Sequence, residues 1–126
     1  MAHNLAKTRT VLAYDASPSW TSKIESSNIK PITSVEGVVK GSDTIITMLP
    51  NDKIVKGVAE VVFKESKKTL IDSSTISPYA SYDLAEMAKK SNNTYLDAPV
   101  SGGVGGAKMG TLTFMVGAEK ELYEKV

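Results

Sequence analysis

The chain has 126 residues, of which 41% are hydrophobic and 23% are charged, a balance that is ordinary for a globular domain. Its formal net charge is +1, so nothing in the charge balance favours nucleic acid or an anionic membrane as a partner. The sequence has no cysteine and a single histidine, which excludes disulfides and thiolate metal sites and predicts no metal centre.

Short β-branched runs alternate with helical segments along the chain. The segment MAHNLAK at 1–7 has a helical pattern, and further helices are predicted at 51–64 and 77–90. The predicted strands lie at 10–15, 30–33, 43–49, 68–73, 93–98 and 111–117. This alternation predicts a single α/β domain, with a doubly wound, mainly parallel sheet and helices on both of its faces.

The two longer helices show apolar residues at helical spacing. The apolar face expected in 51–64 consists of Ile54, Val58, Val61 and Val62, and that in 77–90 consists of Ala80, Leu84, Met87 and Ala88. Ser77 followed by Pro78 is typical of a helix N-terminus. Tyr79 and Tyr82 lie one turn apart in that helix, and we expect both to be partly buried against the sheet.

Small and polar residues follow several of the predicted strands. They are Asp15, then Leu49, Pro50 and Asn51, then 72–75, and finally 97–103. In open parallel sheets, ligands bind beyond the carboxyl ends of the strands. The sequence therefore predicts a ligand crevice along this edge.

Asp15 ends the strand VLAYD, and two interpretations of it remain open. In a dinucleotide-binding fold an acidic residue at this place accepts hydrogen bonds from the adenosine ribose and repels a 2′-phosphate. Alternatively, Asp15 is a turn aspartate facing Pro18.

The stretch LDAPVSGGVGGAKMGTLTFMVG at 96–117 is rich in glycine but matches neither phosphate-binding pattern. Lys108 occupies the third glycine position of G-x-G-x-x-G, and Thr111 occupies the lysine position of a P-loop. Two interpretations remain: a loop in which backbone N–H groups and Ser101 bind a small anion such as a carboxylate, or a plain connection without a ligand.

Four motifs, in this order, resemble the 3-hydroxyisobutyrate dehydrogenase family of β-hydroxyacid dehydrogenases. They are TMLP (47–50), IDSST (71–75), DAPVSGG (97–103) and GTLTFMVG (110–117). The resemblance implies a Rossmann-like domain and an enzyme that uses NAD to oxidise 3-hydroxyisobutyrate to methylmalonate semialdehyde, a step of valine catabolism.

The resemblance also implies roles for individual residues. Asp15, Met48, Leu49, Pro50, Ser74 and Thr75 are expected to bind NAD, and Ser101, Gly102 and Gly103 to bind the carboxylate of the substrate. It further implies a small-molecule substrate, a homo-oligomeric full-length enzyme, and a place in the mitochondrial matrix of a eukaryote or the cytoplasm of a bacterium.

The chain departs from the family pattern in three respects. We expect residues 1–126 to be an incomplete dinucleotide-binding domain, without the first strand and its glycine-rich loop. The catalytic lysine of the family lies beyond Val126, so no catalytic residue is assigned. We likewise expect the C-terminal helical domain to be absent and this chain alone to be inactive.

Two other functions remain open. One is a related NADPH-dependent reductase of tartronate, succinic or glyoxylate semialdehydes, against which Asp15 argues. The other is a non-catalytic dinucleotide-binding or scaffold member of the superfamily. For the sheet, a missing first strand predicts a gap between the strands at 10–15 and 43–49, direct pairing of the two, or a strand recruited from another copy.

Overall fold

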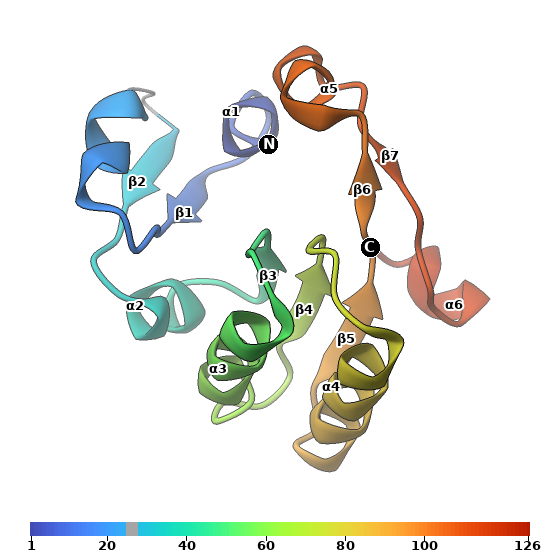
Figure 1. The fold of residues 1–126 in the computed structure, drawn as a ribbon. Coiled ribbons are helices and arrows are strands. Elements are labelled where there is room, and N and C mark those ends of the chain that lie inside the picture. The colour runs from blue at the N-terminus through green and yellow to red at the C-terminus, as the bar shows by residue number, and fades with distance from the viewer. Residues whose placement is uncertain (25–27) are drawn as a thin grey trace.

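The computed structural model describes residues 1–24 and 28–126. The elements follow one another as α1 (Ala2–Leu5), β1 (Val11–Ala13), η1 (Pro18–Lys23), β2 (Ile29–Pro31), α2 (Val35–Lys40), β3 (Thr44–Thr47), α3 (Asp52–Val62), β4 (Thr69–Asp72), α4 (Pro78–Lys90), β5 (Thr94–Asp97), β6 (Val100–Ser101), α5 (Gly103–Met109), β7 (Thr113–Phe114) and α6 (Lys120–Tyr123). Each predicted strand is present but shorter than expected, and Figure 1 shows their arrangement.

The described strands form three separate sheets. β1 pairs with β2 in parallel, β3, β4 and β5 form a parallel sheet in that order, and β6 pairs with β7 antiparallel. The parallel α/β class is therefore confirmed. Within the described ranges β1 and β3 do not pair, and Figure 1 shows them apart. Of the three arrangements predicted for these two strands, direct pairing is therefore wrong.

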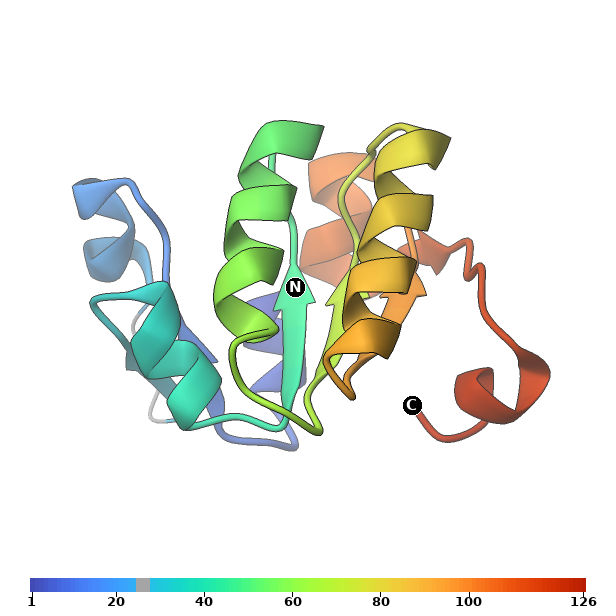
Figure 2. The same ribbon diagram turned by 90° about the horizontal axis from the view of Figure 1, so that it is seen from below.

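The hydrophobic core lies between the β3–β4–β5 sheet and helices α3 and α4. Its fully buried side chains include Val55, Val62, Leu70 and Leu84. Figure 2 shows α3 and α4 on one side of this sheet, with α1 and α5 on the opposite side. The sheet therefore has helices on both sides, as the sequence predicts.

Helix α4 begins and buries its apolar face as predicted. Ser77 caps it by accepting a hydrogen bond from the backbone N–H of Ala80 (3.2 Å), and Pro78 occupies the first turn. Leu84 and Ala88 are buried. The prediction for Tyr79 and Tyr82 was wrong: their side chains are 86% and 68% exposed, because both lie on the outer face of the helix.

The apolar face of α3 is rotated by one residue from the predicted one. Val62 is buried as predicted, but it is joined by Val55 and Ala59, whereas Ile54 is 42% exposed. These buried positions have the same i, i+4, i+7 spacing as the predicted set, so periodicity alone could not choose between them. Small Ala59 at the centre lets the helix approach the core closely, and Val58 and Val61 remain partly buried at its border.

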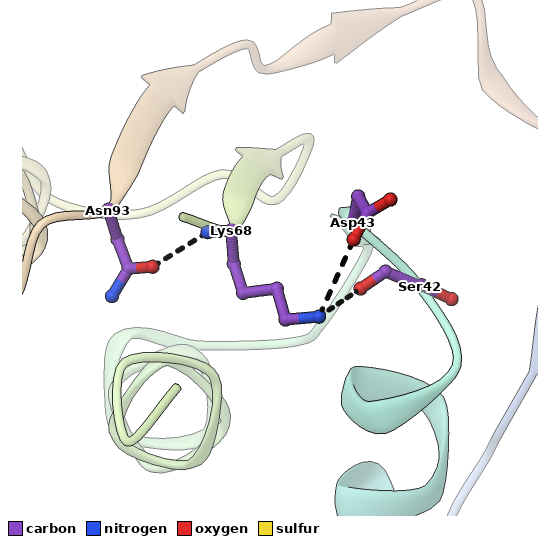
Figure 3. Close-up of polar contacts among 4 residues, drawn as sticks. All are labelled: Ser42, Asp43, Lys68 and Asn93. Atoms are coloured by element: carbon purple, nitrogen blue, oxygen red, sulfur yellow. Dashed lines mark hydrogen bonds and ion pairs between the residues drawn. The ribbon is translucent and has the colours of Figure 1, made fainter. Parts of the chain in front are cut away.

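A set of polar contacts joins the amino ends of the three parallel strands (Figure 3). The Lys68 ammonium donates a hydrogen bond to the backbone carbonyl of Ser42 (2.8 Å) and lies 3.7 Å from a carboxylate oxygen of Asp43. The backbone N–H of Lys68 donates to Asn93 Oδ1 (2.8 Å). Because Asp43 is exposed, the carbonyl contact of Lys68 stabilises this end of the sheet more than the ion pair does.

The free edge of β3 leads to a prediction about association of the 126-residue chain. Unpaired strand edges are templates for pairing with another chain, and Ile46 on β3 is 39% exposed. We expect the chain alone to self-associate and to melt over a broad range, as measured by sedimentation velocity and circular dichroism. Ile46→Lys should shift the population towards monomer.

The matched control is Ile54→Lys, which adds the same charge at an equally exposed isoleucine on α3. This variant should leave association unchanged. A monomeric mass together with a sharp two-state melt for the unsubstituted chain would contradict the prediction.

Candidate functional site

The segments that follow β3, β4 and β5 meet at one edge of the sheet. The pairing is parallel and in register, so Thr47 lies beside Asp72, and Asp72 lies beside Asp97. Residues 48–50 and 73–75, which follow β3 and β4, therefore begin side by side at the carboxyl ends of these strands. This is the edge at which open parallel sheets bind ligands, and the structure brings together there the polar segments expected from the sequence.

The buried side chain of Asp72 joins the end of β3 to the segment that follows β4 through hydrogen bonds. Its side chain is fully buried, and its Oδ1 accepts hydrogen bonds from Thr47 Oγ1 (2.8 Å) and from the backbone N–H of Ser74 (3.1 Å). Ser74 Oγ in turn accepts a hydrogen bond from the backbone N–H of Leu49 (2.9 Å). The loops after β3 and β4 are thus fixed to one another.

A second polar contact joins the starts of α3 and α4 beside the same edge. Ser77 donates from its hydroxyl to Asp52 Oδ2 (2.6 Å) and from its backbone N–H to Oδ1 (3.1 Å). These hydrogen bonds lower the pKa of Asp52, because they favour its charged form. The segment containing Thr75 is therefore held between two anchored points.

The predicted cofactor residues of this edge differ in exposure. Met48 (59% exposed), Pro50 and Thr75 are open to solvent, and Leu49 is half-buried. Ser74 is buried, and its hydroxyl is already used for the bond from Leu49. The exposed side chains are the ones that can touch a ligand, while Ser74 holds the loop beneath them.

Asp15 lies apart from these residues, just beyond the end of β1. Its Oδ1 accepts a hydrogen bond from the backbone N–H of Ser17 (2.8 Å), which is the turn predicted as one of its two roles. The side chain remains exposed. A carboxylate in this position can still accept hydrogen bonds from the hydroxyls of a ribose, so the turn and the ligand role are compatible.

Asp97 and Tyr95 lie on β5, next to α4. Partial burial, together with the charge of neighbouring Asp72, raises the pKa of Asp97. Burial also raises the pKa of Tyr95, whose hydroxyl donates to Ser81 Oγ (3.4 Å). The sequence places Asp72 and Asp97 in the segments of the predicted crevice, but it predicts no individual role for either. The signal was their spacing: Thr47, Asp72 and Asp97 follow one another at intervals of 25 residues, the offset of the parallel register.

The glycine-rich segment is not the loop that the sequence suggested. Residues Gly103–Met109 form helix α5, which connects β6 and β7. Gly102 and Gly103 have φ angles of 130° and 60°, a region that favours glycine, and so allow the sharp turn into the helix. Leu112 packs against Gly106 and Gly102. A side chain on Gly106 would crowd Leu112, so this glycine permits the packing that stabilises the helix.

Ser101, Gly102 and Gly103 are all exposed at the start of α5. Ser101 pairs with Thr113 across the short antiparallel sheet, which fixes its backbone. A hydroxyl followed by two glycines presents polar groups without shielding side chains. This arrangement suits a small ligand with oxygen acceptors, such as a carboxylate.

Neither a metal centre nor a membrane-spanning helix is found in the described ranges. No three His, Asp or Glu side chains of residues 1–24 and 28–126 lie close enough together to hold a metal ion. Within the same ranges, no helix is long and apolar enough to cross a membrane.

The parallel sheet with its polar carboxyl edge defines a dinucleotide-binding α/β domain. The whole chain, residues 1–126, matches the NAD binding domain of 6-phosphogluconate dehydrogenase, and the chain belongs to this family. NAD is its cofactor, and the exposed Asp15 carboxylate suits a ribose hydroxyl.

Curated relatives support the predicted resemblance. The mitochondrial 3-hydroxyisobutyrate dehydrogenase of Homo sapiens is 40% identical over 98% of this chain and 38% of its own length. The probable enzyme of Dictyostelium discoideum is 38% identical over 93% of this chain and 38% of its own length. The chain thus spans less than half of the length of these relatives.

A solved structure shows the same fold. The 3-hydroxyisobutyrate dehydrogenase of Mycobacterium tuberculosis, determined with L-serine, has a TM-score of 0.91 and 32% identity, covering 98% of this chain and 43% of that one. The Rossmann-like class and the resemblance to 3-hydroxyisobutyrate dehydrogenases are therefore confirmed.

Removal of the Asp72 carboxylate should destabilise the domain. In Asp72→Ala the buried N–H of Ser74 and the hydroxyl of Thr47 lose their acceptor, and we expect a loss of about 2 kcal/mol in the free energy of unfolding. Urea denaturation measures this loss. Asp83→Ala, at an exposed position of α4, is the control and should change stability by less than about 0.5 kcal/mol. Equal effects of the two substitutions would show that the Asp72 contacts do not stabilise the fold.

Proposed function

We propose that the whole protein that carries this chain is an NAD-dependent dehydrogenase of 3-hydroxy acids. Its substrate is 3-hydroxyisobutyrate, which it oxidises to methylmalonate semialdehyde in the catabolism of valine. The observation that carries the proposal is the exposed Ser101–Gly102–Gly103 turn, which offers a hydroxyl and unshielded backbone to a carboxylate beside the carboxyl edge of the sheet. The names of the relatives support the same substrate.

Bound NAD supplies the hydride acceptor. Asp15 accepts hydrogen bonds from the adenosine ribose, and the exposed Met48 and Pro50, with Leu49, line the adenosine side of the cofactor. Thr75 approaches the nicotinamide half, and the buried Ser74 fixes the backbone there through Leu49. These residues bind and orient the cofactor, which carries the chemistry itself.

Ser101, Gly102 and Gly103 would bind the substrate carboxylate and so orient the hydroxy acid for oxidation by NAD. We assign the removal of the hydroxyl proton to no residue of this chain. We propose that a lysine beyond Val126 takes this proton, as the family resemblance implies. The helical domain that the same resemblance implies would carry this lysine and form a homo-oligomer. We place the enzyme in the mitochondrial matrix of a eukaryote or the cytoplasm of a bacterium, and the mitochondrial relatives support the former.

The experiment that tests the function measures NADH formation by the whole protein with 3-hydroxyisobutyrate. The matched control is its amide, which has the same carbon skeleton and hydroxyl but no carboxylate. We expect turnover of the acid and at least tenfold lower kcat/KM for the amide, because the amide loses the charge-assisted hydrogen bonds. NAD-dependent stabilisation without turnover of the acid would indicate a non-catalytic binding module instead.

Asp15 should set the preference for NAD over NADP. Its negative charge repels a 2′-phosphate, and Asp15→Asn removes that charge while keeping the shape. We expect the ratio of kcat/KM for NAD to that for NADP to fall about tenfold, a change of about 1.4 kcal/mol. Asp43→Asn, at the opposite edge of the sheet, is the control and should leave the ratio unchanged. An unchanged ratio in Asp15→Asn would show that this residue has no part in cofactor selection.

A further inference from the structure

Helix α5 has a sequence that does not favour a helix. Three of the seven residues of Gly103–Met109 are glycines, the least favourable helix residue apart from proline. A helix this short is also marginal without tertiary contacts. Its position must therefore come from groups outside it, and the Ser101–Gly103 turn at its start depends on the same groups.

One such group is the side chain of Asn4, on helix α1. Its amide Nδ2 donates a hydrogen bond to the carbonyl of Ala107 (2.7 Å) and lies 3.5 Å from that of Lys108. Carbonyls in the last turn of a helix have no partner within the helix. Asn4 supplies that partner, although it lies 103 positions before Ala107 in the sequence. Figures 1 and 2 show α1 and α5 side by side.

Gly110, the residue at the end of α5, leaves room for the side chain of Asn4. Gly110 has a φ of 73°, the left-handed conformation common just past a helix end. A side chain at Gly110 would begin 3.4 Å from Asn4 Nδ2 and 3.5 Å from Asn4 Cγ. The backbone of Gly110 therefore lies directly against the Asn4 amide, and the contact has little room to shift.

Helix α1 is itself anchored. Asn28 donates a hydrogen bond from Nδ2 to the carbonyl of Ala6 (2.9 Å), and Ala6 is buried. Asn4 therefore projects from a fixed element that leads directly into β1 and towards Asp15. Through Asn4, the segment that carries Asp15 is connected to the segment that carries Ser101.

We propose that Asn4 is a positioning residue, which holds α5 by its C-terminal end and thereby places Ser101, Gly102 and Gly103 for the substrate carboxylate. The proposal rests on the function proposed above for Ser101–Gly103. Asn4 acts through α5 and does not touch the reacting atoms. Its loss should therefore weaken the binding of the hydroxy acid while NAD binding is retained.

Steady-state kinetics of the whole protein test this selectivity. In Asn4→Ala we expect KM for 3-hydroxyisobutyrate to rise about five- to tenfold, the effect of one hydrogen bond, while the Kd for NAD stays within twofold. His3→Ala removes an exposed side chain from the same helix and should change neither value. An unchanged KM for the acid, or equal weakening of acid and NAD, would overturn the proposal.

Hydrogen exchange gives a readout that does not depend on turnover. The backbone N–H of Gly106 donates to the carbonyl of Gly102, and that of Thr111 donates to the carbonyl of Gly106. In Asn4→Ala we expect both amides to exchange at least five times faster, while amides in α4 stay unchanged. Unchanged exchange in α5 would refute the positioning role even if the enzyme is active. If the wild-type protein does not oxidise the acid, the proposed function is refuted. The exchange comparison still decides whether Asn4 holds α5, because it does not require turnover.

The isosteric variant Asn4→Asp is a second test, in case Asn4→Ala fails to fold. It keeps the shape of the side chain but removes the donor and places a charge against two carbonyls. It should raise KM and speed exchange at least as much as Asn4→Ala. A wild-type KM in Asn4→Asp would show that the hydrogen bond does not position α5.

Discussion

The in-register parallel pairing of β3, β4 and β5 is the constraint on which the rest of the domain depends. The two crossovers have equal length, so each residue lies beside the residue 25 positions further along. The same offset repeats at both edges: Lys68 meets Asp43 and Asn93 at the amino end, and Asp72 meets Thr47 and Asp97 at the carboxyl end. One edge stabilises the sheet, and the other fixes the loops of the candidate site.

Among the residues that the structure describes, no strand pairing joins the other half of the domain to this sheet. The β1–β2 pair carries Asp15 and is separated from β3 by the break in the sheet. Helix α2 packs against α3 on one side of the break. On the other side, Asn4 connects α1 to α5. The relative position of Asp15 and Ser101 therefore rests on helix packing and on side-chain hydrogen bonds. Such contacts are more sensitive to single substitutions than a continuous backbone ladder is.

The fold and the candidate site can be predicted from the sequence where the interactions that determine them are local. The start and buried face of α4 could be predicted, because the Ser77–Pro78 cap and the Leu84–Ala88 spacing lie within one helix. The segments of the candidate edge could be predicted because they follow the strands. The burial of Ser74 and the role of Asp72 could not, since they depend on register. Helix α5 was missed because its glycines argue against a helix and its support comes from α1 and Leu112.

The separation of 103 positions between Asn4 and Ala107 also bears on the order of folding. A contact between residues that are near in the sequence forms a small loop, so it forms early. A contact between distant residues must form a large loop, which costs more chain entropy. Each strand of the β3–β4–β5 sheet finds its neighbour after 25 residues, so this sheet can assemble while the chain is still emerging from the ribosome. The Asn4 contact requires α5, which is synthesised near the end of these 126 residues. We therefore expect residues 101–103 to be the last part of the candidate site to reach their native geometry.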